Sequence, residues 1–122
     1  MWGLVVWFSR TRPGRSLMGA IFESFSDLLP VERLWESDTL VSFYHPKPIF
    51  PVHVLIVPKR SITSVTDLGD QDADFLIDLV QCVRILVSDL NLERSGYRLI
   101  SNGGKYQDVP QLHFHLVSED TD

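Results

Sequence analysis

One long amphipathic segment limits the folds that this chain can adopt. Between Asp70 and Leu90, apolar residues recur at intervals of three and four, which is the spacing of one face of an α-helix. These apolar positions are Phe75, Leu76, Leu79, Val80, Val83, Leu86, Val87 and Leu90. Three aspartates, Asp70, Asp72 and Asp74, stand where the helix dipole favours negative charge. We therefore predict a helix over residues 70–90 that packs its apolar face against another part of the fold.

Segments typical of β-strands lie on both sides of this helix. The strand patterns cover residues 34–36, 40–44, 52–57, 97–101 and 109–117. The Pro-rich stretch 45–51 is expected to be a loop, because each proline removes a backbone donor from a strand ladder. The short connections favour antiparallel pairing. The predicted fold class is therefore α+β, with an antiparallel sheet and one long helix packed on it.

Composition narrows the class of protein. A chain of 122 residues that is 44% hydrophobic fits one globular domain. A net charge of -5 argues against electrostatically driven binding to nucleic acid, which usually needs a basic surface. Cys82 is the single cysteine, so it cannot form an internal disulfide, and nothing indicates an oxidising compartment. We expect a soluble, cytoplasmic domain.

The N-terminal segment has a composition of its own. Residues 1–8 are almost all apolar and are followed by Arg10, Arg12 and Arg15. Eight residues are too few to span a bilayer, and a signal peptide has its positive charge before the apolar run. Helical spacing then returns over residues 16–29. We favour a helix that caps the core. The alternative is a basic and apolar N-terminal segment that contacts a membrane surface or a partner.

The candidate chemistry lies in the last predicted strand. Side chains alternate along a strand, so Leu112, Phe114 and Leu116 share one face while Gln111, His113 and His115 share the other. A histidine can be a neutral nucleophile or carry a proton near pH 7. His53 joins these residues if its strand lies next to theirs. The residues alone leave two alternatives open. The histidines could be merely packed or solvated, or His53, His113 and His115 could hold a zinc ion.

The segment Gln107–Val117 (QDVPQLHFHLV) resembles the signature of the histidine triad (HIT) family, in which three histidines alternate with apolar residues. Matching blocks precede it, in family order, at residues 36–43, 51–59, 96–99 and 102–103. The resemblance implies a HIT-like domain over residues 31–118, between an arm and helix at 1–30 and an acidic tail at 119–122. It also implies a homodimer with a continuous sheet.

The resemblance implies a chemistry as well. Members of the family hydrolyse or transfer nucleoside monophosphates that are attached through phosphoramide, ester or anhydride links. His113 would be the nucleophile that attacks the α-phosphorus and forms a nucleotidyl-histidine. His115 would contact the phosphate, while Asn102, Gln107 and His53 would orient the reacting groups. The implied partner is a purine nucleotide or nucleotide conjugate, and neither a metal nor another cofactor is required.

Three positions depart from the family pattern. Gln111 replaces the first histidine, and an amide cannot relay protons. His45 stands where many members carry an aspartate that holds the ribose. Asp108 stands near the expected phosphate, with Lys105 as its predicted partner. The primary prediction is a hydrolase or nucleotidyl transferase of phosphoramidase type. The alternative is a nucleotide-binding regulatory dimer with little or no turnover.

Overall fold

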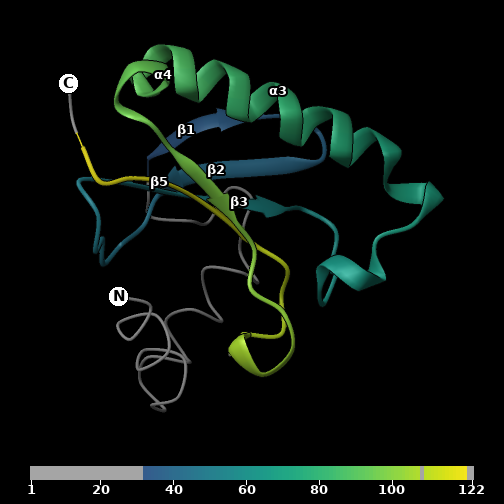
Figure 1. Ribbon diagram of the computed structural model, residues 1–122. Helices are drawn as coiled ribbons and strands as arrows, with labels where there is room; N and C mark the ends of the chain where they lie inside the picture. The colour runs from purple at the N-terminus through teal and green to yellow at the C-terminus, as the bar shows by residue number, and fades with distance from the viewer. Residues whose placement is uncertain (1–31, 108, 121–122) are drawn as a thin grey trace.

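The fold is built on an antiparallel sheet whose strands are not in chain order (Figure 1). The computed structural model describes residues 32–107 and 109–120. The strands are β1 (Arg33–Glu36), β2 (Leu40–Tyr44), β3 (Val52–Pro58), β4 (Arg98–Ile100) and β5 (Phe114–Ser118). Their order across the sheet is β1-β2-β3-β5-β4, and every neighbouring pair is antiparallel. The predicted α+β class is confirmed.

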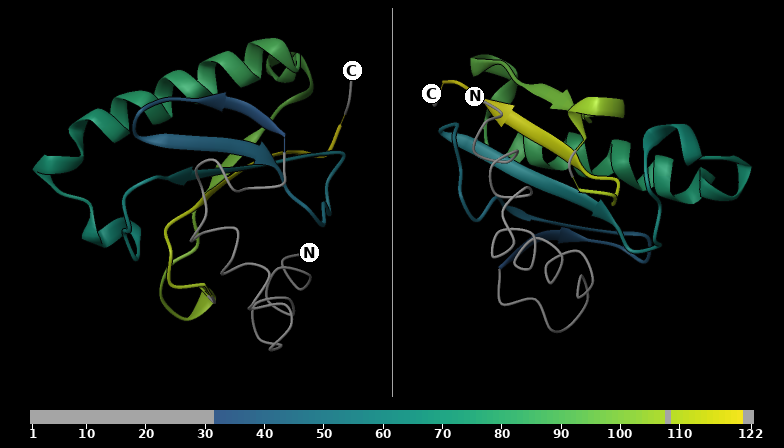
Figure 2. Two further views of the ribbon diagram at one scale, coloured as in Figure 1. Left: turned by 180° about the vertical axis from the view of Figure 1, so that it is seen from behind. Right: turned by 90° about the horizontal axis from the view of Figure 1, so that it is seen from below.

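Helix α3 (Ala73–Asp89) lies across one face of the sheet, as the view from below makes clear (Figure 2). Its buried side chains are Phe75, Leu79, Cys82, Leu86 and Val87. They form one cluster with sheet residues that include Leu40, Val54, Ile56 and Leu116. The predicted packing of an apolar helix face is thus confirmed, although Leu76 and Val80 lie outside it and are 41% and 59% exposed.

The helix begins later than its sequence pattern indicates. Residues Asp70–Asp72 form the 3-10 turn η2, and α3 follows at Ala73. The cause is the side chain of Asp72, which accepts hydrogen bonds from the Arg60 guanidinium and from the backbone N–H of Gly69. Two further 3-10 turns, η1 (Val65–Asp67) and η3 (Gly104–Tyr106), and the short helix α4 (Leu92–Ser95) were not expected from the sequence.

Strand β3 is buried on both faces. Val52, Val54 and Ile56 belong to the cluster under α3. Because side chains alternate along a strand, His53 and Leu55 point to the opposite face of the sheet. That opposite face is where the candidate chemistry lies.

The prediction that a strand spans residues 109–117 is wrong at its beginning. Strand β5 begins only at Phe114, so Gln111 and His113 precede the strand instead of lying in it. Pro110 has no backbone donor, and the N–H of Leu112 bonds to the carbonyl of Ile62 at 2.7 Å, outside the sheet ladder. The chain therefore turns before the ladder begins, and of Gln111, His113 and His115 only His115 is placed by strand geometry.

Several expectations fall outside the described residues: the N-terminal arm, the helix over residues 16–29, and Asp108. Within 32–107 and 109–120, no helix has the length and apolar character needed to cross a membrane.

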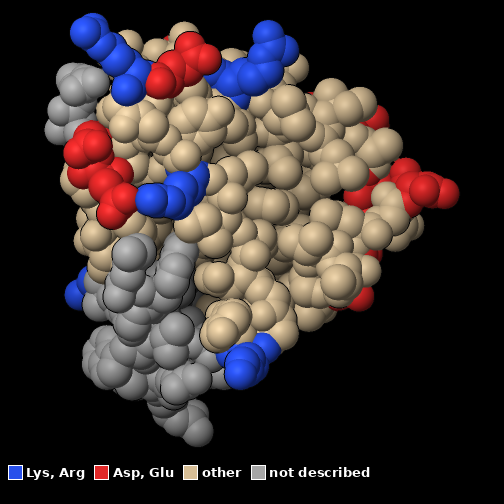
Figure 3. All heavy atoms as spheres, viewed as in Figure 1, with Lys and Arg blue, Asp and Glu red and all other residues tan. Residues whose placement is uncertain are grey.

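Charged side chains are unevenly distributed over one face of the molecule (Figure 3). In the space-filling view they lie mainly at the margins of the face shown, and its middle is largely uncharged (Figure 3). The exposed apolar side chains of the described residues include Leu76 and Val80 on α3 and Leu99 on the edge strand β4.

Candidate active site

Four histidines gather on the face of the sheet opposite α3. His53 lies in β3 and His115 in β5, and the two strands are paired so that Leu55 is opposite His115. His45 follows β2 directly, and its N–H donates to the carbonyl of His53 at 2.8 Å. His113 directly precedes β5. The central pair of strands therefore brings together residues that are far apart in the sequence.

The four imidazoles pack against one another. The ring centroids of His45 and His53 are 4.4 Å apart, and those of His53 and His115 are 5.2 Å apart. His113 packs edge-on against His115 at 4.9 Å. The structure thus unites the three histidines predicted to act on the phosphate with His45.

Hydrogen bonds set the position of the proton on each ring. The N–H of Ile49 donates to His53 Nδ1 at 3.3 Å, so the proton of neutral His53 is on Nε2. His53 Nε2 then donates to His115 Nδ1 at 2.9 Å, and neutral His115 carries its proton on Nε2. A chain of hydrogen bonds therefore runs from the backbone of the Pro-rich loop through His53 to His115, and each hydrogen bond fixes the tautomer of the next imidazole.

His113 is held in the other tautomer. Its Nδ1 is 2.9 Å from the backbone carbonyl of Gln111, which can only accept, so Nδ1 carries the proton. Nε2 consequently bears the lone pair. The carbonyl of His113 itself accepts a hydrogen bond from Ser101 Oγ at 2.9 Å. Ser101 is a positioning residue that the sequence analysis missed, because nothing distinguishes a serine at the end of a strand from a surface serine.

Burial keeps the cluster neutral. Desolvation lowers the pKa of His45 to about 3, with His53 and His113 contributing, and lowers the pKa of His53 to about 4. Desolvation also lowers the pKa of His115, and it lowers the pKa of His113 against an opposing effect of the Gln111 carbonyl. All four side chains are less than a tenth exposed. Near pH 7 the site consequently presents neutral donors and one neutral lone pair.

The other predicted site residues are not part of the cluster of packed imidazoles. Gln111 is buried, and it acts on His113 through its backbone carbonyl. The side-chain amide of Gln107 donates to the carbonyls of Thr63 and Val109, at 2.6 Å and 3.1 Å, and so ties two loops together. Asn102 is half-buried beyond the end of β4.

Lys105 is exposed in η3, with its amine 5.8 Å from the centroid of the Tyr106 ring. Its predicted partner, Asp108, lies outside the described residues, so that ion pair stays a prediction.

The described histidines are not arranged as a zinc site. No group of three or more His, Cys, Asp or Glu side chains in 32–107 and 109–120 has a metal-binding arrangement. His53 Nε2 and His115 Nδ1 face each other at 2.9 Å, which is a hydrogen-bond distance and leaves no room for an ion between them.

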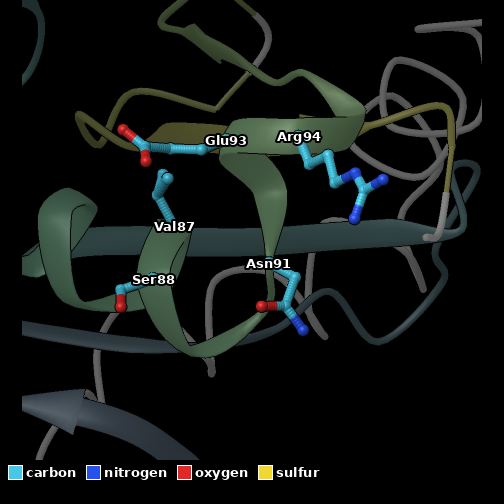
Figure 4. Close-up of a pocket in the computed structure, with 5 residues that line it drawn as sticks. All are labelled: Val87, Ser88, Asn91, Glu93 and Arg94. Carbon is cyan, nitrogen blue, oxygen red and sulfur yellow. The ribbon is translucent and has the colours of Figure 1, made fainter.

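A surface hollow of about 410 Å³ lies elsewhere, where α3 meets α4. The residues that line it are Val87, Ser88, Asn91, Glu93 and Arg94 (Figure 4). None of the predicted site residues lines this hollow, and its two charged side chains are of opposite sign. We therefore place the candidate chemistry at the histidines.

Comparison with known proteins agrees with this geometry. Residues 29–122 match the HIT domain. An uncharacterized HIT-like protein of Helicobacter pylori is 32% identical over 94 residues, which cover 75% of this chain and 88% of the relative. An uncharacterized HIT-like protein of Rickettsia prowazekii is 29% identical over 92 residues, which cover 73% of this chain and 77% of the relative.

Solved structures extend the similarity to the fold. A HIT family hydrolase from Clostridium thermocellum superposes with a TM-score of 0.71 at 33% identity, covering 84% of this chain and 88% of that one. A histidine triad nucleotide-binding protein from Candida albicans gives 0.69 at 29% identity, covering 85% and 75%. The resemblance of the histidine-containing segment is confirmed: this chain belongs to the histidine triad (HIT) family.

Proposed function

We propose that the protein is a nucleotide-binding hydrolase or nucleotidyl transferase that reacts through His113. The observation that carries the proposal is the tautomer of this residue. Its proton is held on Nδ1 by the Gln111 carbonyl, so the nucleophilic lone pair is on Nε2 before any substrate binds. The similarity to a HIT family hydrolase and to a histidine triad nucleotide-binding protein supports the same chemistry.

The reaction divides one displacement into two. In the first step, His113 Nε2 forms a bond to the α-phosphorus of a nucleoside phosphoramidate, ester or dinucleoside polyphosphate, and the leaving group departs with the electron pair of its bond to phosphorus. In the second step, water or another acceptor forms a bond to phosphorus, and the electron pair of the P–N bond returns to Nε2. The incoming water or hydroxyl loses its proton to solvent.

The other histidines stabilise charge on the phosphoryl oxygens. With its Nδ1 occupied by His53, His115 has its proton on Nε2 and can donate to an oxygen of the transferring group. The neutral state of the cluster avoids a positive charge on the nucleophile. We assign the phosphate contact to His115 and its orientation to His53.

The replacement of the first histidine by Gln111 is compatible with this mechanism. The group that orients His113 is the carbonyl of residue 111, and every amino acid supplies one. What is lost is a titratable side chain. This loss is the observation behind the second candidate function, a nucleotide-binding regulatory protein with little or no turnover.

Intact-protein mass spectrometry distinguishes the two functions. The protein is incubated briefly with an adenosine phosphoramidate or a diadenosine polyphosphate and trapped at high pH. We expect a mass increase of one nucleoside monophosphate in the wild type, and none in His113→Ala. The matched control is Tyr106→Phe, a change at an exposed side chain outside the cluster. Nucleotide binding by calorimetry without adduct or product would support the regulatory alternative.

We further propose that two chains form a homodimer through α3 and β4. Strand β4 is at the edge of the sheet, so one side of its backbone has no strand partner within the described sheet. Tyr97 and Leu99 are 46% and 40% exposed beside it, and Tyr97 lines the same hollow as Val83 of α3. Leu76 and Val80 are further exposed apolar side chains of α3, and we take these four residues as the apolar patch that a second copy would cover.

A further inference from the structure

The backbone around the nucleophile is held by contacts outside the sheet. His113 directly precedes β5 and lies outside the pairing of β5 with β3. Its carbonyl accepts a hydrogen bond from Ser101 Oγ at 2.9 Å. The N–H of the preceding residue, Leu112, donates to the carbonyl of Ile62 at 2.7 Å. This second contact joins the nucleophile's segment to the loop that follows β3, and the mechanism above does not use it.

The Leu112 N–H belongs to the same peptide group as the Gln111 carbonyl. A peptide group is planar, and in its trans form the N–H and the C=O point in opposite directions. The direction of the N–H therefore fixes the direction of the carbonyl. This carbonyl is 2.9 Å from His113 Nδ1 and holds the proton there. The acceptor at Ile62 is thus connected to the tautomer of the nucleophile through one rigid group.

The same connection bears on the reactivity of the ring. Successive hydrogen bonds polarise one another, so a peptide group that donates through its N–H becomes a better acceptor at its carbonyl. Desolvation lowers the pKa of His113, and the Gln111 carbonyl opposes that shift. A stronger acceptor at Nδ1 makes Nε2 more basic, which favours its attack as a nucleophile.

Ile62 itself is held from two directions. Its side chain is 3% exposed and belongs to the core cluster under α3. Two residues earlier, the Arg60 guanidinium donates through Nη2 to both carboxylate oxygens of Asp72, at 2.6 Å and 2.8 Å. Asp72 is buried, and the ion pair joins the two ends of the loop over residues 60–72. The carbonyl that faces Leu112 therefore has a fixed position.

We propose that Ile62 is a positioning residue for the nucleophile, and that its backbone carbonyl keeps His113 in the reactive tautomer through the 111–112 peptide group. The inference rests on the proposed function, because it takes His113 Nε2 to be the attacking atom. Ile62 acts through the backbone of the nucleophile's segment and not by contact with the ligand. Loosening it consequently slows the attack on phosphorus and leaves the affinity for nucleotide unchanged.

Two substitutions loosen this contact without changing a histidine. Ile62→Ala removes most of the side chain that anchors the carbonyl. Its matched control is Leu86→Ala, since Leu86 is also 3% exposed in the same core cluster but lies in α3, across the sheet from the histidines. Arg60→Ala breaks the ion pair and is compared with Arg84→Ala, a change at an exposed arginine of α3. Thermal unfolding identifies a temperature at which the variants are folded.

The first measurement needs no ligand. Heteronuclear NMR of the imidazole nitrogens distinguishes an N–H nitrogen from one that bears a lone pair, and so reports the tautomer of His113 in the free protein. We expect the proton on Nδ1 in the wild type and both controls, and a mixture of tautomers in Ile62→Ala and Arg60→Ala. The wild-type tautomer alone in both folded variants would overturn the proposal.

The second measurement separates rate from affinity. It compares the rate of adduct formation at saturating adenosine phosphoramidate with the Kd of adenosine 5′-monophosphate from calorimetry. We expect Ile62→Ala to react about ten- to a hundredfold more slowly than Leu86→Ala, since a nucleophile displaced by about 1 Å loses rate on that scale. The Kd should stay within about threefold. Equal rates in these two variants would contradict the proposal, and so would a loss of affinity as large as the loss of rate.

The two proposals fail in different ways. The expected contrast in tautomers without any adduct at His113 would leave the positioning by Ile62 intact and remove the covalent mechanism. An adduct in the wild type, with the same tautomer and the same rate in each variant and its control, would do the reverse.

Discussion

Each histidine of the cluster has lost most of its contact with water, and this changes how the protein responds to acid. The pKa of His45 is lowered to about 3 and that of His53 to about 4, both by desolvation, from an unfolded value of about 6.5. Below about pH 6.5 the unfolded chain therefore binds protons that the native protein does not. By linkage, the native state is favoured above this pH and loses stability as the pH falls towards the native pKa values.

The first prediction follows from this difference. Above about pH 7.5, titration of these histidines should not change the free energy of unfolding. Between about pH 6 and pH 4, the free energy of unfolding should fall by about 1–3 kcal/mol for each pH unit of acidification. Denaturant titrations across that range measure it. In His45→Gln one of the titrating groups is gone, so the slope should be smaller. A free energy of unfolding that does not change between pH 7 and pH 5 would contradict the prediction.

The second prediction concerns Gln111. Because the backbone carbonyl of Gln111 orients His113, removing the side chain leaves the orienting group in place. We expect Gln111→Ala to form the nucleotidyl adduct at a rate within about tenfold of the wild type, whereas loss of the nucleophile abolishes it. Adduct loss as complete as in His113→Ala would show that the amide itself is needed.

At this scale, sequence reasoning could group the histidines but could not give the position of the proton on each ring. His53 could be grouped with His113 and His115 only on the condition that its strand lies next to theirs, and the structure brings the three together. The tautomers could not be predicted. They depend on backbone groups of Ile49, Lys47 and Gln111, whose directions are set by loops that carry no periodic pattern.

At the scale of secondary-structure elements, the regular parts were predicted well and the irregular beginnings were not. The 3.6-residue pattern predicted α3 well, because its apolar face is buried against the sheet. Its beginning was misplaced by the three residues of η2, where the Asp72 side chain competes for backbone and guanidinium donors. The beginning of β5 was misplaced because Pro110 and the Leu112–Ile62 hydrogen bond turn the chain.

The third prediction concerns the contact between the β1–β2 turn and α3. Asp78 of α3 accepts hydrogen bonds from Ser37 Oγ at 2.8 Å and from Thr39 Oγ1 at 2.7 Å. Asp78→Ala removes the acceptor of both hydroxyls and should lower the free energy of unfolding by about 1–3 kcal/mol. Gln81→Ala, an exposed change on the same helix, should have an effect within about 0.5 kcal/mol. Equal effects of the two substitutions would show that the contact is not stabilising.

At the scale of the whole molecule, the proposed homodimer would cover the exposed apolar side chains of α3 and β4. The uncharged middle of the face in Figure 3 agrees with this proposal. A stable homodimer generally buries more than about 1,000 Å² in total, and an edge strand that pairs with its own copy contributes backbone hydrogen bonds as well.

The fourth prediction tests this interface. Val80→Glu places a charge in the patch and should shift the mass measured by light scattering from dimer towards monomer, without changing the secondary structure measured by circular dichroism. Val65→Glu is the matched control, because Val65 is similarly apolar and 45% exposed but lies in η1, outside the patch. A wild-type protein that is monomeric at micromolar concentration would refute the proposed dimer.

Strand β5 has a consequence for the route by which the protein reaches its native state. It follows every other described strand in sequence, yet it lies inside the sheet, between β3 and β4. Its pairing with β3 joins Val52 to Ser118, so it closes a loop that contains most of the domain. Such long-range closure is slow compared with helix or hairpin formation. We therefore expect the nucleophile and its neighbours to come together late in folding, so that refolding chains regain the proposed nucleotide binding no earlier than full tertiary structure.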